Sequence, residues 1–346
     1  MAPRPTHALP KHEVVVITGG SAGVGRAVAQ RFAREGAWIG LLARDPARLE
    51  DAKREIESLG GKAVIHAGDV ADPAAHEAIA DLVEQTFGAI DIWINNAMTS
   101  VYSMIHEMPP EEFRRVTDVT YLGVVYGTQS ALRRMRARDR GMIVQVGSTL
   151  AYRSIAFQSA YCAAKHAVRG FTNSLRSELK HDRLKIGLTM VQLPAVNTPQ
   201  FLWARNRLSQ AAKPPAPIYQ PEVAAEAIWW AAHHRRREVY VGYKTSLGIK
   251  LNKLIPAFLD RFLGKRSFGE AQRTRDPRQP DNLWRPAKGL YAARGPYVAE
   301  AQSGSLHLTI SKHRSAWLWA FVGMASAVAF AWRRKNPSRG PVWNRR

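Results

Sequence analysis

Short apolar runs alternate along this chain with longer stretches in which apolar residues recur at helical spacing. The apolar, β-branched runs predict buried strands at residues 14–17, 37–43, 62–66, 90–94, 142–146, 185–192 and 238–241. The stretches between them predict helices at residues 26–35, 45–59, 73–87, 110–138, 158–180 and 221–234. Strict alternation of strand and helix favours an α/β fold built on a doubly wound parallel sheet.

A glycine-rich turn joins the first predicted strand to the first predicted helix. Strand, glycine turn and helix form the dinucleotide-binding arrangement of Rossmann-like sheets, because glycine lets the backbone approach a pyrophosphate at the helix N-terminus. The turn is therefore a candidate cofactor site. Its candidate binding residues are Thr18, Gly19, Ser21, Gly23, Val24 and Gly25.

The ends of the second and third predicted strands bear on the choice of cofactor. An acidic residue after the second strand accepts the ribose hydroxyls of NAD, whereas a basic residue suits the additional phosphate of NADP. Here Arg44 follows the strand and Asp45 comes next, which favours NADP(H) over NAD(H). Arg44 could equally cap the following helix or pair with Asp45. After the third strand, Asp69 is a candidate for hydrogen bonding to the adenine ring, with Val70 beside it.

Ser148, Tyr161 and Lys165 are the candidate catalytic residues. Ser148 follows the fifth predicted strand, at the sheet edge where ligands bind. Tyr161 and Lys165 are four apart on the next predicted helix, so they share one face, although this pair also occurs by chance on exposed helices. A lysine ammonium favours the phenolate form of a tyrosine, which would let Tyr161 exchange a proton while Ser148 hydrogen-bonds a substrate oxygen. This chemistry interconverts an alcohol and a carbonyl.

In this order and spacing the motifs resemble those of the short-chain dehydrogenase/reductase family, over residues 13–242. The matching residues are the glycine turn, Asp69, Asn95-Asn96-Ala97, Ser148 and Tyr161-x-x-x-Lys165. The resemblance implies a compact oxidoreductase in which Tyr161 is the general acid in reduction and the base in oxidation. It also implies that Lys165 lowers the pKa of Tyr161 and holds the nicotinamide ribose, and that the chain forms a homo-oligomer. The cofactor contacts implied in this way are Tyr161, Lys165, Asn95, Ala97, Pro194, Val196 and Thr198, the last binding the carboxamide.

Three positions depart from the family pattern. Thr120 stands where the family has an asparagine that completes a proton relay, so Thr120 is a candidate relay residue with a shorter reach. Ala195 replaces the glycine that usually follows Pro194, and Met98 replaces the glycine that often follows Asn-Asn-Ala. Ser148, Tyr161 and Lys165 are intact, so hydride transfer remains the expectation.

The region that covers the substrate in the family is apolar here. Residues 197–217 lose clear periodicity and contain Phe201, Leu202 and Trp203. These side chains indicate either a hydrophobic substrate or a lid that packs onto the body.

Charge and cysteine content limit the function further. The formal net charge is +22, and residues 251–346 hold 18 Lys or Arg against 5 Asp or Glu. An anionic membrane surface is the favoured partner, a solvated basic tail is the alternative, and no nucleic-acid-binding module is recognisable. The single cysteine, Cys162, excludes an intrachain disulfide and a cysteine-based metal site, and no metal ligands are predicted.

The chain outside the oxidoreductase domain divides into three parts. Residues 1–12 are expected to be a flexible N-terminus without a secretory signal, which places the body in the cytoplasm. The domain is expected over residues 13–264, with a helix at 247–262. An irregular arm follows at 265–311, in which Leu283 and Trp284 are candidate anchors to the body.

Residues 312–346 are predicted to form a hydrophobic helix with basic flanks. The stretch 315–332 has no charged residue, tryptophans near both ends and a helical length of about 27 Å, close to a bilayer core of about 30 Å. A spanning anchor is favoured over a shallow insertion or a buried packing helix, although the basic tail behind it prefers the cytoplasmic side. The enzyme is therefore expected at the cytoplasmic face of a membrane, with a purely cytoplasmic location as the alternative.

Together these features predict an NADP(H)-dependent oxidoreductase that interconverts an alcohol and a ketone or aldehyde on an apolar substrate. The alternative from another functional class is a non-catalytic NADP(H)-binding sensor or scaffold at the membrane.

Overall fold

The computed structural model describes residues 12–267, 273–274, 281–289 and 291–313. The chain divides into a unit that ends at Ser305 and a second unit whose described part holds α11 (Leu306–Lys312). Within the described ranges no helix is long and apolar enough to cross a bilayer. The predicted anchor at 315–332 lies outside them, as does nearly all of the predicted flexible N-terminus.

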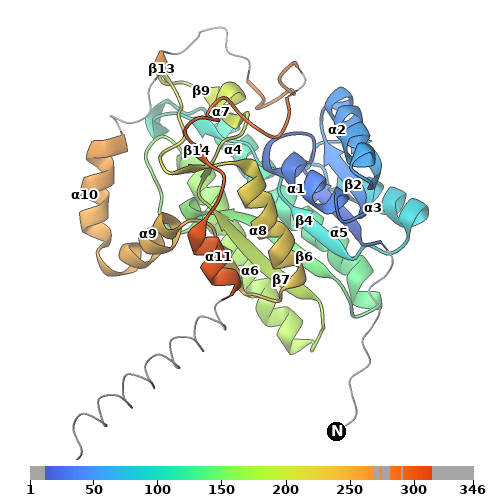
Figure 1. The fold of residues 1–346 in the computed structure, drawn as a ribbon. Coiled ribbons are helices and arrows are strands. Elements are labelled where there is room, and N and C mark those ends of the chain that lie inside the picture. Colours follow the sequence, from blue (N-terminus) through green and yellow to red (C-terminus); the bar gives the residue numbers. More distant parts are fainter. Residues whose placement is uncertain (1–11, 268–272, 275–280, 290, 314–346) are drawn as a thin grey trace, which may run out of the picture. The chain divides into compact units, whose positions relative to one another are not determined.

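A seven-stranded parallel sheet forms the centre of the first unit, as predicted (Figure 1). Its strand order is β12-β7-β6-β4-β1-β2-β3, which places β1 and β4 side by side in the middle. The strands are β1 (Val14–Thr18), β2 (Trp38–Ala43), β3 (Lys62–Ala67), β4 (Ile92–Asn95), β6 (Met142–Ser148), β7 (Gly187–Leu193) and β12 (Glu238–Tyr240). Because all pairs are parallel, the carboxyl ends of the strands meet at one edge of the sheet.

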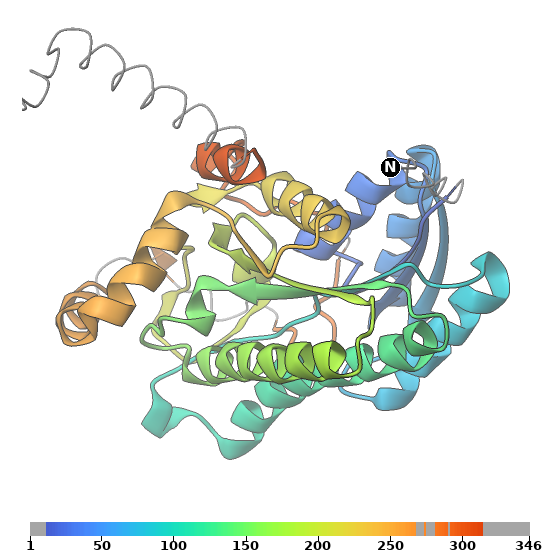
Figure 2. The ribbon, with the colours of Figure 1, turned by 90° about the horizontal axis from the view of Figure 1, so that it is seen from below.

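Helices cover both faces of the sheet (Figure 2). On one face α1 (Gly23–Ala33) packs beside α8 (Pro221–His233), and on the other α3 (Pro73–Phe87), α5 (Gly123–Ala137) and α6 (Ser159–His181) lie in a row. The helix α2 (Pro46–Ser58) follows β2; Asp45 caps it by accepting a hydrogen bond from the Arg48 amide.

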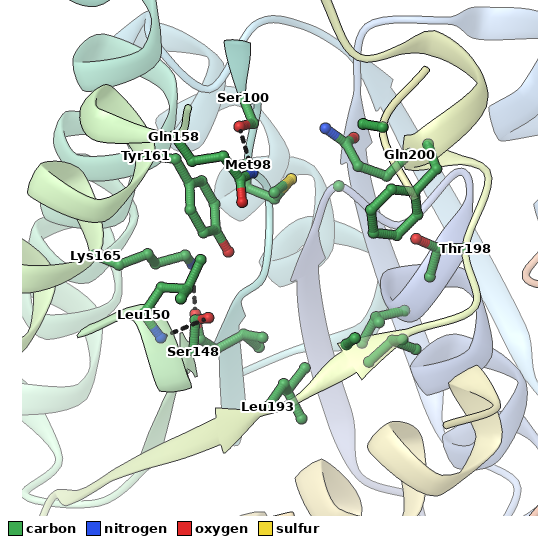
Figure 3. A pocket seen from close by; sticks show the side chains of 18 of the residues that line it. Met98, Ser100, Ser148, Leu150, Gln158, Tyr161, Lys165, Leu193, Thr198 and Gln200 are labelled. Carbon is green, nitrogen blue, oxygen red and sulfur yellow. Dashed lines mark hydrogen bonds between the residues drawn. The ribbon is translucent and has the colours of Figure 1, made fainter. Parts of the chain in front are cut away.

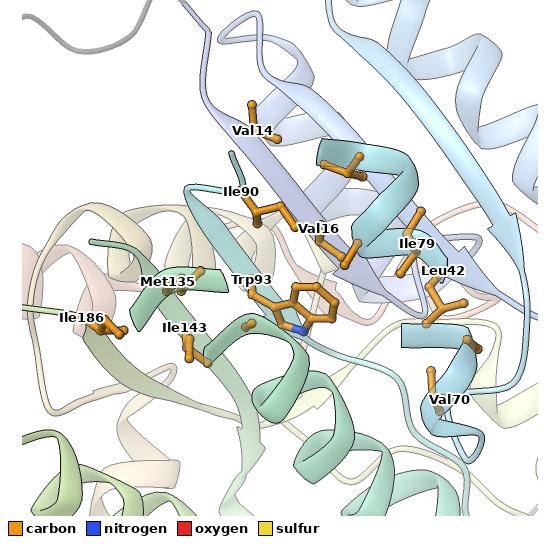
Figure 4. Close-up of a cluster of buried hydrophobic side chains, with 14 of the residues drawn as sticks. Val14, Val16, Leu42, Val70, Ile79, Ile90, Trp93, Met135, Ile143 and Ile186 are labelled. Atoms are coloured by element: carbon orange, nitrogen blue, oxygen red, sulfur yellow. The ribbon is translucent and has the colours of Figure 1, made fainter. Parts of the chain in front are cut away.

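Among the residues that the structure describes, Trp93 is the largest fully buried side chain, and it lies in the middle of the sheet (Figure 4). It packs among aliphatic side chains from both layers, and its indole Nε1 donates a 2.9 Å hydrogen bond to Asn95 Oδ1. The cluster includes Val16, Leu42, Ile79, Met135 and Ile143. Each such side chain contributes about 1.5–3 kcal/mol through burial, and together they make a rigid base for the sheet edge.

Two predicted helices are interrupted, each for a local reason. The predicted helix over 110–138 is α4 (Pro110–Thr117), a π-helical turn at Asp118–Leu122, and α5. The predicted helix over 247–262 is two helices, α9 (Tyr243–Leu254) and α10 (Pro256–Ser267). Pro256 lacks an amide hydrogen and restricts the residue before it, so the first helix ends at Leu254.

Short elements complete the unit around the cleft. They are β5 (Val101–Tyr102), β8 (Ala195–Val196), β9 (Arg205–Asn206), β10 (Gln210–Ala211), β11 (Ile218–Tyr219), β13 (Arg273–Thr274), β14 (Ala301–Gln302), α7 (Gln200–Trp203) and 3-10 turns at Ile105–Glu107 and Thr149–Ala151. β14 pairs with β11, which pairs with β8, so the end of the arm is tied to the segment after β7.

Candidate active site

One large cleft, of about 570 Å³, opens at the carboxyl edge of the sheet. Residues that directly follow β1, β2, β3, β4, β6 and β7 all contribute to its wall. Ligands of open parallel sheets bind at this edge, where neighbouring crossovers leave space between them.

Ser148, Tyr161 and Lys165 come together on one wall of the cleft (Figure 3). Ser148 ends β6, and its Oγ accepts a 3.1 Å hydrogen bond from the Leu150 amide. Tyr161 and Lys165 lie on the buried face of α6, with the Lys165 Nζ 5.7 Å from the centre of the tyrosine ring. Thr198 and Gln200 face them across the cleft (Figure 3). The three polar groups therefore surround a space in which a carbonyl can be held.

Burial is the largest influence on the titration of Lys165 and Tyr161. Burial lowers the pKa of Lys165 to about 8, and its Nζ donates a 2.8 Å hydrogen bond to the Val146 carbonyl. Burial also raises the pKa of Tyr161 above its ordinary value, and a hydrogen bond with Ser148 offsets only part of that shift. Desolvation of the phenol is the largest influence on Tyr161. A lower pKa of Tyr161 through Lys165, which the family resemblance implies, stays a prediction.

The glycine turn is built for close approach of a ligand. A Cβ at Gly25 would lie 2.2 Å from the Gly19 carbonyl oxygen, so only glycine fits there. Gly19 has a φ of +68°, which favours glycine as well. Gly19, Ser21, Gly23 and Val24 line the cleft, where the positive end of the α1 dipole can meet an anion.

The far end of the cleft carries several charged groups. Arg44, Asp45, Arg48 and Asp69 all line it. Burial lowers the pKa of Arg44. Asp69 accepts a 3.0 Å hydrogen bond from the Ala71 amide and pairs with Arg115. Burial would raise the pKa of Asp69, but these hydrogen bonds and the nearby guanidinium charges hold it below its usual range.

The opposite end is formed by the segment after β7. Pro194, Val196 and Thr198 line the cleft there, and Val70 and Ala97 contribute to its floor. Asn197 is fully buried and donates a 3.1 Å hydrogen bond to Gln220, which fixes the loop that carries Thr198.

Four candidate residues do not line the cleft. The Thr120 hydroxyl donates to the Thr99 carbonyl at 2.9 Å and accepts from the Thr99 amide at 3.0 Å, so it braces the loop after β4. Asn95 lies in a buried network with Trp93, Thr128 and Gln145. Thr18 accepts hydrogen bonds from the Asn96 and Ala97 amides, and Gly25 packs against Gly19. The structure thus places these residues behind the cleft wall.

Several lining residues did not figure among the sequence-based candidates. Arg48 lines the cleft one turn after Arg44, and its guanidinium lies 5.1 Å from the centre of the Trp203 ring. Arg48 lies on the face of α2 that points to the end of β2, and this position could have marked it as a candidate from the sequence. Gln158 donates a 3.0 Å hydrogen bond to Ser100 beside Tyr161.

Aromatic and aliphatic side chains form the rest of the cleft. They are Tyr102, Ile155, Phe157, Phe201, Trp203, Leu208 and Leu263. Lys213, Lys244 and Arg153 lie among them at the rim. A substrate in this half of the cleft meets a largely apolar wall with cations at its edge.

A nicotinamide dinucleotide fits the residues that are present. The glycine turn provides a cradle that any Cβ at Gly25 would fill, and the N-terminus of α1 behind it faces the cleft. The half-buried Arg44 and the buried Arg48 provide cations for a phosphate at one end, and Tyr161 with Lys165 provides the reacting groups at the other.

Comparisons with known proteins agree with this geometry. A family model described as short chain dehydrogenase matches residues 13–206. The oxidoreductase YxnA of Bacillus subtilis is 32% identical over 285 residues, which covers 81% of this chain and 80% of that protein. A fatty acyl-CoA reductase of Acinetobacter baylyi is 32% identical over 232 residues, covering 66% and 76%. A crystal structure of a metagenomic short-chain oxidoreductase in complex with NADP matches with a TM-score of 0.56 and 26% identity, over 66% of this chain and 96% of that one.

The chain therefore belongs to the short-chain dehydrogenase/reductase family and is an NAD(P)-dependent oxidoreductase. The seven-stranded sheet and the cleft at its carboxyl edge are the family's Rossmann-like architecture.

Proposed function

We propose that this protein uses NADP(H) to interconvert an alcohol and a ketone or aldehyde on an apolar substrate. The observation that carries the proposal is the convergence of Ser148, Tyr161 and Lys165 on one wall of a cleft that also holds the glycine turn. A bound nicotinamide would supply or accept the hydride. Tyr161 donates the proton to the carbonyl oxygen in reduction and removes it in oxidation, and Ser148 orients that oxygen.

The preference for NADP(H) rests on the charges at the far end of the cleft. Arg44 and Arg48 both line it, and Asp45 pairs with Arg48 at 2.9 Å, which engages both of these side chains and leaves Arg44 as the main cation for a phosphate. A guanidinium favours a phosphate dianion, because charge-assisted bonds to phosphate are about twice as strong as neutral ones. The similar structure with bound NADP supports the same choice.

The apolar substrate class rests on the other half of the cleft. Aromatic and aliphatic side chains, among them Tyr102 and Leu263, form its wall, and Leu263 belongs to the helix α10. A relative whose name is fatty acyl-CoA reductase supports a substrate with a long hydrocarbon part.

The first test is an activity screen on the full chain. NADPH and NADH are each mixed with ketones and aldehydes of increasing chain length, and cofactor oxidation is followed by absorbance. We expect faster oxidation of NADPH and a kcat/KM that rises with chain length, by up to about tenfold for each pair of buried methylene groups. Binding of NADPH without oxidation by any carbonyl compound would favour the non-catalytic alternative.

Association with a membrane surface is proposed as well. The helices α9 and α10 and the residue between them expose several large apolar side chains: Tyr243, Leu247, Leu254, Ile255, Phe258 and Phe262. Tyr243, Leu247 and Leu254 share one face of α9 because they are four and seven residues apart. Lys250, Lys253 and Arg261 are exposed among them. An apolar stripe with interleaved cations is typical of helices that lie on anionic lipid.

This surface is continuous with the rim of the cleft. Lys244 and Thr245 of α9 and Leu263 of α10 line the cleft, and Arg153 at the rim pairs with Asp260 of α10 at 2.8 Å. A membrane beneath α9 and α10 would thus lie beside the apolar end of the cleft, where a lipid-dissolved substrate would enter.

A fluorescent label tests the membrane contact. Cys162 is buried and is the sole cysteine, so a polarity-sensitive dye on Phe258→Cys reports on α10 alone. We expect its emission to shift to the blue with vesicles that contain phosphatidylserine, and to shift less with phosphatidylcholine alone. A dye on Ile105→Cys, which replaces a side chain 60% exposed on another element, should not shift. Equal responses at both positions, or none at Phe258→Cys, would contradict the proposed orientation.

A further inference from the structure

A segment of the C-terminal arm follows the cofactor half of the cleft from one end to the other. This arm segment comprises residues 281–289 and 291–302, and Figure 1 shows it in orange and red beside α1, α7 and α8. It lies beyond residues 13–206, the range of the family model. Its contacts fall at three successive parts of the cofactor site.

The first contact is at the adenosine end. The guanidinium of Arg44 donates hydrogen bonds to the Asn282 carbonyl and, at 3.2 Å, to the Leu283 carbonyl. Arg115 Nε also donates to the Leu283 carbonyl, at 3.0 Å, while Arg115 Nη2 pairs with the Asp69 carboxylate. Asn282 and Pro286 themselves line the cleft. The arm segment therefore forms part of the wall around the predicted phosphate-binding arginine.

The second contact is at the glycine turn. The Gly23 amide donates a 3.2 Å hydrogen bond to the Ala292 carbonyl, and Arg26 Nη1 lies 3.4 Å from the Tyr291 carbonyl. Tyr291 also stacks edge-on against Trp203, with ring centres 4.6 Å apart. The arm segment thus touches the turn that would hold the pyrophosphate.

The third contact is at the loop that carries Thr198. The Gly295 amide donates a 3.1 Å hydrogen bond to the Asn197 carbonyl, and the Tyr297 amide donates a 2.9 Å hydrogen bond to Asn197 Oδ1. A Cβ at Gly295 would lie 2.4 Å from the Thr198 carbonyl oxygen, so the two backbones touch. The arm segment thus braces the nicotinamide end as well.

Apolar side chains hold the arm segment in place. Leu283 is 0% exposed and packs in the same cluster as Tyr161, together with Val101, Met108 and Val116. Ala287, Ala293 and Tyr297 are buried too, whereas the predicted second anchor, Trp284, is 52% exposed. The segment is therefore a packed part of the domain, with Leu283 as its anchor at the adenosine end.

The hydrogen bonds to Arg44 have a direct consequence for cofactor choice. A guanidinium has five N–H donors in a rigid fork, and two backbone carbonyls occupy part of it here. These bonds fix the orientation of the fork before any ligand arrives, which reduces the entropy lost when the remaining donors bind a phosphate.

We propose that the arm segment is part of the cofactor site: it holds Arg44 in place for the NADP(H) phosphate and forms the outer wall of the adenosine pocket. It therefore determines the preference for NADP(H) over NAD(H) and is itself stabilised by the bound cofactor. This inference rests on the proposed use of NADP(H).

The first test compares binding of both oxidised cofactors to the full chain by calorimetry. Leu283→Ala leaves a cavity under the Arg44 contact, so the Kd for NADP⁺ is expected to rise about tenfold or more, and the Kd for NAD⁺ by less than about threefold. Leu283→Met should restore binding close to that of the wild type, because it conserves volume. Val298→Ala, which truncates a side chain 49% exposed on the same segment, should change neither Kd.

The second test needs no variant. Hydrogen–deuterium exchange of the wild type is measured with and without saturating NADP⁺. We expect slower exchange of the Gly295 and Tyr297 amides and of the amides around Leu283, and no change around Arg183, an exposed position in the turn after α6.

The outcomes separate this inference from the proposed function. The inference alone would be overturned by three results together. The wild type prefers NADP⁺, Leu283→Ala keeps the wild-type Kd for both cofactors, and the arm segment exchanges deuterium equally with and without NADP⁺. A wild type that binds NAD⁺ as tightly as NADP⁺ would overturn the proposed cofactor preference and, with it, the role of the arm segment in selecting NADP(H).

Discussion

Replacement of Tyr161 by phenylalanine is expected to lower kcat by about 10²–10⁴-fold, the contribution of a positioned general acid or base. The ring still packs in its cluster with Val101 and Leu283, so the fold is retained. The Kd for NADP(H) should change by less than about threefold, because the phenolic hydroxyl acts on the substrate oxygen. Steady-state kinetics and cofactor titration measure the two effects separately.

Tyr102→Phe is the matched control, because Tyr102 lines the same cleft without belonging to the predicted catalytic group. It should retain most of the wild-type kcat. Full activity of Tyr161→Phe, or an equal loss in both variants, would mean that Tyr161 does not carry the proton.

Replacement of Lys165 by methionine is expected to lower kcat by a similar factor and to change how the stability of the fold depends on pH. Burial lowers the pKa of Lys165 from 10.5 in the unfolded chain to about 8. The unfolded chain therefore binds more protons between these two values, and the wild type gains stability as pH rises from 8 to 10.5. The shift corresponds to about 3 kcal/mol of cost for the buried ammonium at pH 7.

Methionine does not titrate, so the Tm of Lys165→Met relative to wild type should be highest near pH 7 and fall toward pH 10.5. Loss of the hydrogen bond to the Val146 carbonyl offsets part of the gain at every pH and does not alter the trend. Lys180→Met, at an exposed lysine of the same helix, should show no such trend. A pH-independent difference between Lys165→Met and the wild type would contradict the buried ammonium.

The sheet and the catalytic wall could be predicted because their signals are local. Strand runs, the glycine turn and the Tyr161–Lys165 spacing each reflect the geometry of one element, and parallel strands bring their ends together without further information. The cofactor end was less predictable. Arg44 is held by backbone carbonyls 238 and 239 residues away, and no periodicity along the chain encodes such a contact.

Thr120 is a second case in which the sequence alone does not give the position of a side chain. The family resemblance implies a relay role for Thr120, which stays a prediction, and the structure adds that its hydroxyl bonds to the Thr99 backbone from within the π-helical turn at Asp118–Leu122. A π turn adds one residue to a helical turn and rotates every side chain that follows. Sequence spacing alone does not predict that rotation. The break at Pro256, in contrast, follows from the chemistry of one residue.

Transfer of deuterium tests the central claim most directly. NADPH deuterated at the transferable C4 position is incubated with the full chain and the best carbonyl substrate of the activity screen, and the alcohol is analysed by mass spectrometry. The account predicts one deuterium on the carbinol carbon of the product with the wild type and almost none with Tyr161→Phe. A wild type that binds the nucleotide but leaves deuterium on it with every carbonyl compound would contradict an oxidoreductase site built from Ser148, Tyr161 and Lys165.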